Sequence, residues 1–291
     1  MSLQPVIFGE VLFDCFPDGR RILGGAPFNV AWHLRGLGLD PLLVGSVGDD
    51  DAGQAIRQAM DSWKMDASQL QIHRALATGK VQVTLVDGEP EYEITKPSAW
   101  DEIDAPGSLG TGALLYHGTL ALRSEKSRRT IKDLIKRHDS PRFLDLNLRP
   151  PHNDLNALKP FISKLDWMKL NLDELGVLFG LEEISLSQKR AFTQRLRKEF
   201  GIRNILLTAG KAGAWYDGES GQAEVSPAPT PDSLVDTVGA GDAFSAMAIC
   251  GILEGWSVDR ILNRASLFAS RVCSMAGATC TDKGLYEGII D

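Results

Sequence analysis

The chain has 291 residues, of which 43% are hydrophobic and 24% are charged, with a formal net charge of −7. This globular composition excludes an intrinsically disordered chain. The acidic balance disfavours nucleic acid and anionic membranes as partners, and no apolar run is long enough to span a bilayer. The N-terminus lacks a signal-peptide pattern and the four cysteines are scattered, so we expect a cytoplasmic protein with free thiols.

Short apolar runs alternate with helix-like runs through most of the chain. The apolar runs predict strands at residues 6–13, 42–46, 114–117, 143–146, 167–170 and 205–208. Several are apolar throughout, as is typical of parallel strands buried on both faces. Helical spacing between them completes βαβ units. We therefore predict an α/β fold forming a single domain over residues 1–291, with a central, mostly parallel sheet.

Residues 78–96 do not follow this alternation of strand-like and helix-like runs. Alternating apolar and polar residues run into Asp87-Gly88 and then into a second such stretch, which predicts a β-hairpin. With residues 10–22 this hairpin would form a small antiparallel sheet. Ligands of open α/β sheets bind beyond the carboxyl ends of the strands, so we expect a β lid made by about residues 10–22 and 78–100. Its unpaired edges make a homodimer through the lid one expectation.

Residues 236–244, Asp-Thr-Val-Gly-Ala-Gly-Asp-Ala-Phe, carry the strongest chemical signal. They precede an apolar run that predicts a buried helix, whose first amides are unpaired and attract anions. Gly239, Ala240 and Gly241 let this backbone approach a phosphoryl group closely. Asp242 adds a carboxylate beside that anion hole. Phosphoryl transfer needs both charge stabilisation and a base that orients the attacking hydroxyl, so one loop would supply both.

Three motifs in order resemble the PfkB, or ribokinase-like, family of carbohydrate kinases. Residues 236–242 fit its signature D-T-x-G-A-G-D, residues 24–31 are similar to its glycine-pair motif, and residues 171–174 are similar to its N-x-x-E motif. The resemblance covers essentially the whole chain. It implies a ribokinase-like three-layer αβα fold and transfer of the γ-phosphate of ATP to a sugar hydroxyl.

The resemblance also implies roles for individual residues. Asp242 would take the proton from the sugar hydroxyl while the amides of Gly239, Ala240 and Gly241 hold the transferred phosphoryl group. The sugar would lie against Asp14, Gly24, Gly25, Asn29 and Arg149, and ATP against Asn171, Thr208, Gly210, Gly213, Gly239, Gly241 and Asn263. Asn171 and Glu174 would organise Mg²⁺ through water, and Asp236 would help to bind a monovalent cation such as K⁺.

Most of these residues have a plainer alternative role. Asp242 could cap its helix, Gly24-Gly25 could mark an ordinary turn, and Glu174 could be a surface carboxylate. For Arg149 the alternative is a structural salt bridge. Lys211 could be simply solvated, and His117, which follows a strand, could be an ordinary core histidine.

The acceptor is indicated by softer signals. Residues 9–14, 99–101 and 145–150 are similar to segments of fructokinases, which favours fructose. One alternative is a kinase for 2-keto-3-deoxygluconate, with Arg149 at its carboxylate, or for another sugar or a nucleoside. A second alternative, from another class, is a catalytically silent sugar- or nucleotide-binding regulator. The intact Asp242 and anion loop argue against it. No P-loop motif is present.

Overall fold

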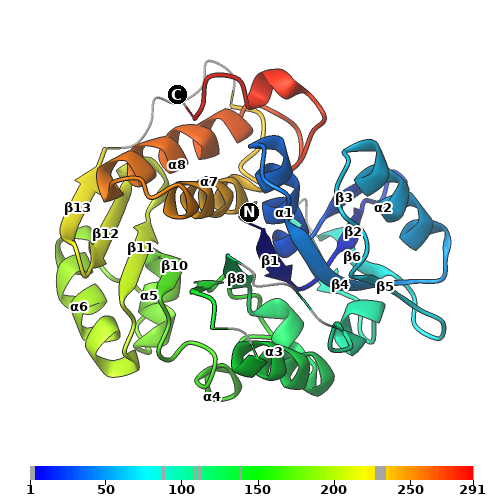
Figure 1. Cartoon of the computed structure of the whole chain (residues 1–291), viewed down its shortest axis with the longest axis horizontal. Coiled ribbons are helices and arrows are strands. Elements are labelled where there is room, and N and C mark those ends of the chain that lie inside the picture. The colour runs from blue at the N-terminus through cyan, green and yellow to red at the C-terminus, as the bar shows by residue number, and fades with distance from the viewer. Residues whose placement is uncertain are drawn as a thin grey trace.

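The computed structural model describes residues 4–86, 89–107, 109, 113–137, 139–226 and 234–290. A nine-stranded sheet forms its centre (Figure 1), in the order β13-β12-β11-β10-β9-β8-β1-β4-β5. Its strands are β1 (Pro5–Phe8), β4 (Leu42–Gly48), β5 (Leu70–His73), β8 (Leu114–His117), β9 (Arg142–Asp145), β10 (Trp167–Asn171), β11 (Asn204–Thr208), β12 (Ala214–Gly218) and β13 (Gly221–Val225). In the sheet, all neighbouring strands from β5 through β4, β1, β8, β9 and β10 to β11 are parallel. β12 pairs with β11 in the antiparallel sense, and β13 pairs with β12 in the same sense. The prediction of an α/β fold with a mostly parallel sheet is confirmed.

Helices cover both faces of this sheet. They are α1 (Ala26–Gly36), α2 (Asp51–Ser62), α3 (Glu125–Arg137), α4 (Leu155–Leu158), α5 (Leu172–Leu178), α6 (Lys189–Phe200), α7 (Ala240–Leu253) and α8 (Val258–Val272). Short 3₁₀ turns are η1 (Ala99–Glu102), η2 (Leu120–Arg123), η3 (Leu186–Gln188), η4 (Gly210–Ala212) and η5 (Lys283–Leu285). None of the described helices has the length and apolar content that crossing a bilayer requires.

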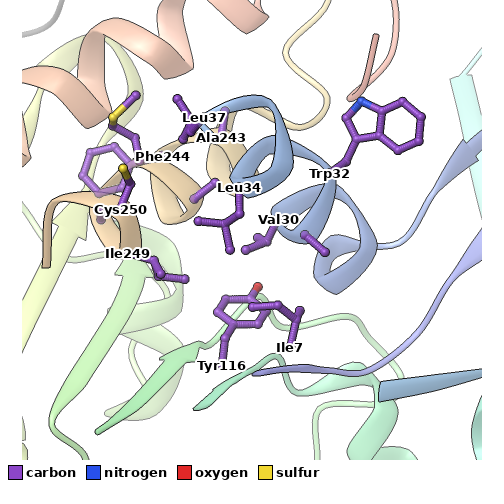
Figure 2. Close-up of a cluster of buried hydrophobic side chains, with 14 of the residues drawn as sticks. Ile7, Val30, Trp32, Leu34, Leu37, Tyr116, Ala243, Phe244, Ile249 and Cys250 are labelled. Carbon is purple, nitrogen blue, oxygen red and sulfur yellow. The ribbon is translucent and has the colours of Figure 1, made fainter. Parts of the chain in front are cut away.

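The core is split by the sheet into two apolar clusters. Successive strand residues point to opposite faces, so Ile7 belongs to the cluster beneath α1, α7 and α8, whereas Phe8 belongs to the cluster beneath α3, α5 and α6. Figure 2 shows Ile7 and Tyr116 pointing from the sheet toward Val30 and Leu34 of α1. The three-layer arrangement follows from strands that are apolar on both faces.

A second, four-stranded sheet stands apart from the first, in the order β3-β2-β6-β7. It contains β2 (Leu12–Cys15), β3 (Arg21–Gly24), β6 (Gly79–Val86) and β7 (Glu89–Ile94). The β6–β7 pairing confirms the predicted hairpin, whose Asp87-Gly88 turn lies outside the described residues. That the small sheet acts as a lid of a single domain stays a prediction.

Two details of the sequence-based prediction were wrong. The small sheet is mixed rather than antiparallel, because β2 and β6 run parallel to each other. The run 6–13 is also not one strand: it divides into β1 of the large sheet and β2 of the small sheet. Gly9 lies at the division, where a Cβ atom would come 2.4 Å from Cγ of Pro27, so only glycine lets the chain turn here against α1.

Candidate active site

The start of α7 is built to receive an anion. Gly239 is its N-cap residue with φ 80°, and no side chain caps the helix. A Cβ atom on Gly239 would lie 2.5 Å from Cβ of Ala278, so the backbone must be glycine for two separate reasons. The amide of Ala240 donates to the carbonyl oxygen of Thr237 at 3.3 Å. The amides of Gly241 and Asp242 have no hydrogen-bond partner among the described residues, so these two remain available to an outside partner at the positive end of the helix dipole.

Asp242 lies in the first turn of α7 and is joined to a distant motif. Asn29, in the first turn of α1, donates a hydrogen bond from Nδ2 to Asp242 Oδ2 at 2.7 Å. Burial raises the pKa of Asp242 to about 6, against the lowering effect of the Asn29 hydrogen bond and of the Lys169 and Arg149 charges, while Asp145 raises it further. At neutral pH the carboxyl group is ionised and still basic enough to accept a proton. This contact fits a functional carboxylate better than a helix cap.

The glycine pair lies against the segment that links the two sheets. Gly24 pairs with Leu12 across β2 and β3, and a Cβ atom on Gly24 would be 3.6 Å from Asp14 Oδ2. Gly25 has φ 105°, and a Cβ atom there would be 2.7 Å from the carbonyl oxygen of Glu10. Burial raises the pKa of Asp14 to about 6, while the Arg149 charge opposes this. The structure thus brings the predicted sugar residues of the N-terminal half together, and their contact with a sugar stays a prediction.

Glu10 is a carboxyl group that the sequence-based site missed. Its side chain is 2% exposed, and its Oε2 atom has no hydrogen-bond partner among the described residues. Burial raises its pKa to about 7; its own backbone amide lowers it, Asp242 raises it, and Arg149 and Arg123 lower it. A glutamate inside the apolar run 6–13 was the available signal.

Arg149 lies at the rim of this group of carboxylates. Its side chain is exposed and donates from Nη1 to the carbonyl oxygen of Leu148 at 3.1 Å. It forms no salt bridge within the described residues, which argues against the structural alternative. Its charge nevertheless lowers the pKa values of Glu10, Asp14 and Asp242.

Lys169 is a second residue that the sequence-based site missed. It lies on β10, is buried, and places Nζ 3.1 Å from both carboxylate oxygens of Asp145. Ser245, one turn into α7, donates to Asp145 Oδ2 at 2.8 Å. A Cβ atom on Gly241 would lie 2.9 Å from Lys169 Nζ, so the ammonium group sits directly beneath the anion-binding turn. A lysine inside the apolar run 167–170 was the signal for it.

The N-x-x-E residues form a complete capping box. Asn171 Oδ1 accepts from the Glu174 amide at 2.8 Å, and Glu174 Oε2 accepts from the Asn171 amide at 2.9 Å. Glu174 Oε1 also accepts from the amide of Leu148 at 2.8 Å, and Glu174 is 7% exposed, so it is not a surface carboxylate. Burial raises its pKa, and the Lys169 charge opposes this. Each oxygen keeps lone pairs for a water, a donor set that fits Mg²⁺ held through water.

The described residues contain no cluster of histidine, cysteine and acidic side chains that could hold a metal ion directly. Asp236 accepts hydrogen bonds from the amides of Val238 at 3.0 Å and Gly277 at 3.3 Å, which ties the anion loop to the segment after α8. This position is compatible with a cation site built from loop carbonyls. That role stays a prediction.

The remaining predicted nucleotide residues are less tightly gathered. Thr208 is in register with Asn171 on the neighbouring strand, at the same edge of the sheet. Gly210 and Gly213, with φ 50° and 99°, shape the turn η4 between β11 and β12. Asn263 is exposed on α8 and donates to its own helix at the Asp259 carbonyl; within the described part of the chain no hydrogen bond joins it to the other predicted nucleotide residues.

Lys211 and His117 were both left open by the sequence. Lys211 is exposed on η4. His117 is fully buried, with Nδ1 2.9 Å from the carbonyl oxygen of Gly118, and burial lowers its pKa to about 4. The histidine is therefore neutral and buried, and its Nε2 atom has no hydrogen-bond partner among the described residues.

Comparisons with known proteins show the family of the chain. The model of the pfkB family carbohydrate kinases matches residues 16–283. A fructokinase from Klebsiella pneumoniae is 33% identical over 264 residues, which is 84% of this chain and 83% of the relative. A 5-dehydro-2-deoxygluconokinase from Clostridium beijerinckii is 24% identical over 88% of this chain and 80% of its own length.

Solved structures share the whole fold. A double mutant of the fructokinase from Vibrio cholerae, with fructose, ADP and potassium ion bound, has a TM-score of 0.82 at 24% identity, covering 98% of each chain. The ribokinase from Arabidopsis thaliana, with ribose and ATP, has a TM-score of 0.82 at 20% identity, covering 100% of this chain and 99% of its own. With a family model that spans most of its length, this chain belongs to the PfkB family of carbohydrate kinases.

Proposed function

We propose that this carbohydrate kinase transfers the γ-phosphate of ATP to a hydroxyl group of a monosaccharide, with fructose as the first candidate. The observation that carries the proposal is the 2.7 Å hydrogen bond between Asn29 and Asp242. This hydrogen bond joins α1, which follows the glycine pair, to α7, whose first turn would bind the phosphoryl group. A sugar hydroxyl and a phosphoryl group would therefore meet at the Asp242 carboxylate.

The chain supplies each part that phosphoryl transfer requires. Asp242 accepts the proton of the attacking hydroxyl and orients it. The amides at the start of α7 stabilise the charge on the moving phosphoryl group, with the Lys169 ammonium beneath them. Mg²⁺, held near Asn171 and Glu174 through water, neutralises charge on the phosphates when bound. Closure of the small sheet would exclude water, which otherwise competes as the acceptor.

Fructose is favoured by similarity to fructokinases, including the relative at 33% identity, and by the segment 145–150. The second candidate is a kinase for 2-keto-3-deoxygluconate or a similar acid, because a relative at 24% identity is a 5-dehydro-2-deoxygluconokinase. A silent regulator is disfavoured, since it would have no need of a half-buried carboxyl group whose pKa is raised to about 6 beside an anion site.

The test is a coupled ADP-release assay with Mg-ATP against fructose, ribose, glucose, 2-keto-3-deoxygluconate and adenosine, with and without K⁺. We expect turnover with fructose above the others. Turnover with a different acceptor alone would keep the kinase and replace its substrate. Silence across the panel, from protein that binds ATP, would contradict the proposal and favour the regulator.

A further inference from the structure

Glu10 is a buried carboxyl group to which the family motifs quoted above give no role. It lies between β1 and β2, where the chain passes from the large sheet to the small one. Its Oε2 atom is buried without a hydrogen-bond partner in the described structure. An unpaired buried carboxylate oxygen costs free energy, so a ligand is a sufficient reason for a fold to keep one.

A second unpaired acceptor lies in the first turn of α1, next to the glycine pair that packs on the Glu10 backbone. Asn29 uses Nδ2 to hold Asp242, but its Oδ1 atom is buried and has no partner among the described residues. Asn29 donates its backbone amide to the carbonyl oxygen of Gly25 at 2.8 Å, and the Gly25 backbone in turn packs on that of Glu10. Asn29 Oδ1 is an acceptor, and so is Glu10 Oε2 when Glu10 is ionised, so the missing partner of the ionised site must bring hydrogen-bond donors. Hydroxyl groups do this, and carboxylates do not.

The charges around Glu10 also favour a ligand with hydroxyl groups over one with a carboxylate. Glu10 is buried, and Asp14 and Asp242 are half-buried; the charge of Arg149 lowers the pKa of all three, and Asp242 raises the pKa of Glu10, so the three carboxyl groups share one end of the site. Of the cations that act on Glu10, Arg123 is already paired with Asp101 and Trp100. Its guanidinium nitrogens lie 2.8 Å from both oxygens of Asp101, and its Cζ lies 3.8 Å from the Trp100 ring centroid.

Arg149 is the other cation that acts on Glu10, and it is exposed. The hydroxyl of Tyr116 is buried, unpaired and within the field of Glu10 and Asp242, but it carries no charge at neutral pH. Among the described residues, a carboxylate on the acceptor would therefore enter a region that holds three carboxyl groups, with Arg149 as its exposed cation and with Lys169 already paired to Asp145.

We propose that Glu10 is a specificity-determining residue for the phosphoryl acceptor. Glu10 Oε2 and Asn29 Oδ1 accept hydrogen bonds from hydroxyl groups of an uncharged sugar, and the three carboxyl groups together reject acceptors that carry a carboxylate. The inference rests on the proposed function for its class of ligand, and it is measured by binding, without phosphoryl transfer.

The experiment is calorimetric titration with fructose and with 2-keto-3-deoxygluconate, in the absence of ATP. The proteins are the unaltered chain, Glu10→Met, Glu10→Gln and the control Glu183→Gln, whose side chain is exposed between α5 and η3. We expect the unaltered chain to bind fructose at least tenfold more tightly than the acid. Glu10→Met should weaken fructose binding about 10- to 100-fold, as expected for loss of a hydrogen bond to a charged group.

Thermal unfolding separates ligand recognition from a structural role. Because Oε2 has no partner in the described part of the chain, Glu10→Met should unfold at the same temperature as the unaltered chain or at a higher one. Glu10→Gln should lose fructose affinity too and narrow the preference for fructose over the acid. Glu183→Gln should match the unaltered chain in all three measurements.

Some outcomes would overturn the role of Glu10, and another would overturn only the proposed kinase function. Normal fructose binding by Glu10→Met, a large loss of its thermal stability, or equal binding of the acid by the unaltered chain would each overturn the inference. So would the absence of sugar binding altogether. If the expected binding pattern appears but no sugar is phosphorylated with Mg-ATP, the inference stands and the proposed kinase function fails.

Discussion

Two groups of buried carboxylates lie close together near the start of α7, and they differ in how fully their hydrogen bonds are satisfied. Asp145 is fully buried and receives Lys169 Nζ and Ser245 Oγ, so both of its oxygens are paired. In the other group, Asp242 has Asn29 as its partner, while an oxygen of Glu10 has none among the described residues.

We call Asp145 with Lys169 and Ser245 the finished group, because its hydrogen bonds are complete, and Glu10 with Asp242 the unfinished group. The finished group supports the backbone, whereas the unfinished group is available to a ligand or a proton. A buried ion pair with complete hydrogen bonds holds a backbone in place, which Asp145 does for β9, β10 and α7 at once. Incomplete hydrogen bonds and raised pKa values are typical of groups that wait for a ligand or a proton. Burial lowers the pKa of Lys169, but Asp145 and Glu174 raise it more, so the lysine stays charged beneath the anion loop.

The largest effect is expected at the unfinished group. Asp242→Asn keeps the shape and an acceptor oxygen for Asn29 but cannot take a proton, so turnover should fall by about 10²–10⁴. Fructose affinity, measured by calorimetry, should change little. Near-normal turnover in the coupled assay, from a variant that folds and binds ATP, would show that Asp242 is not the base.

Lys169→Met tests the finished group. It leaves Asp145 charged and buried with only Ser245, which should lower the free energy of unfolding by about 3–5 kcal/mol. The matched control is Lys189→Met, whose partner Glu224 is exposed, with an expected loss of about 0–1 kcal/mol. Urea titration measures both.

The double variant Lys169→Met with Asp145→Leu sharpens the same test. Removing both charges should recover much of the stability, because no buried charge is then left unpaired. If Lys169→Met were as harmless as the control, Asp145 would not depend on its lysine and the comparison between the two groups would fail.

Local patterns predicted the parts of the molecule that local sequence determines. The apolar runs predicted the parallel strands except β5, and residues 236–242 predicted the start of α7. Each of these depends on neighbours a few residues away, which is the range over which a single sequence can be interpreted.

Contacts between distant residues were beyond that range. Asn29 and Asp242 are 213 residues apart, and β2 pairs with β6 across a whole βαβ unit. Glu10 and Lys169 stood inside apolar runs that were correctly predicted to be buried, but nothing in the sequence showed which partner each would meet. Only the fold shows that Lys169 has a partner and that Glu10 Oε2 has none among the residues that the structure describes.

Glu174→Gln tests whether the capping box belongs to the finished group. Both Glu174 oxygens accept backbone amides, so replacing one with an NH₂ group should lower the free energy of unfolding by about 1–3 kcal/mol. Asp173→Asn, at the exposed neighbouring position, should cost less. If Glu174 also holds a Mg²⁺ water, the half-saturating Mg²⁺ concentration should rise for Glu174→Gln alone. Unchanged stability would place Glu174 in the unfinished group instead.

The pH dependence should distinguish the carboxyl groups within the unfinished site. Asp242, with a pKa of about 6, must be deprotonated to act as base, so kcat/KM for fructose should fall about tenfold per pH unit below pH 6. Glu10, with a pKa of about 7, must be ionised to accept a hydroxyl group most strongly, so the decline should begin near pH 7. Glu10→Met removes that earlier limb and should leave kcat/KM lower but flat down to about pH 6. An unchanged onset in Glu10→Met would mean that Glu10 does not titrate in the free enzyme over this range, and that the difference between the two groups rests on Asp242 and Asp14.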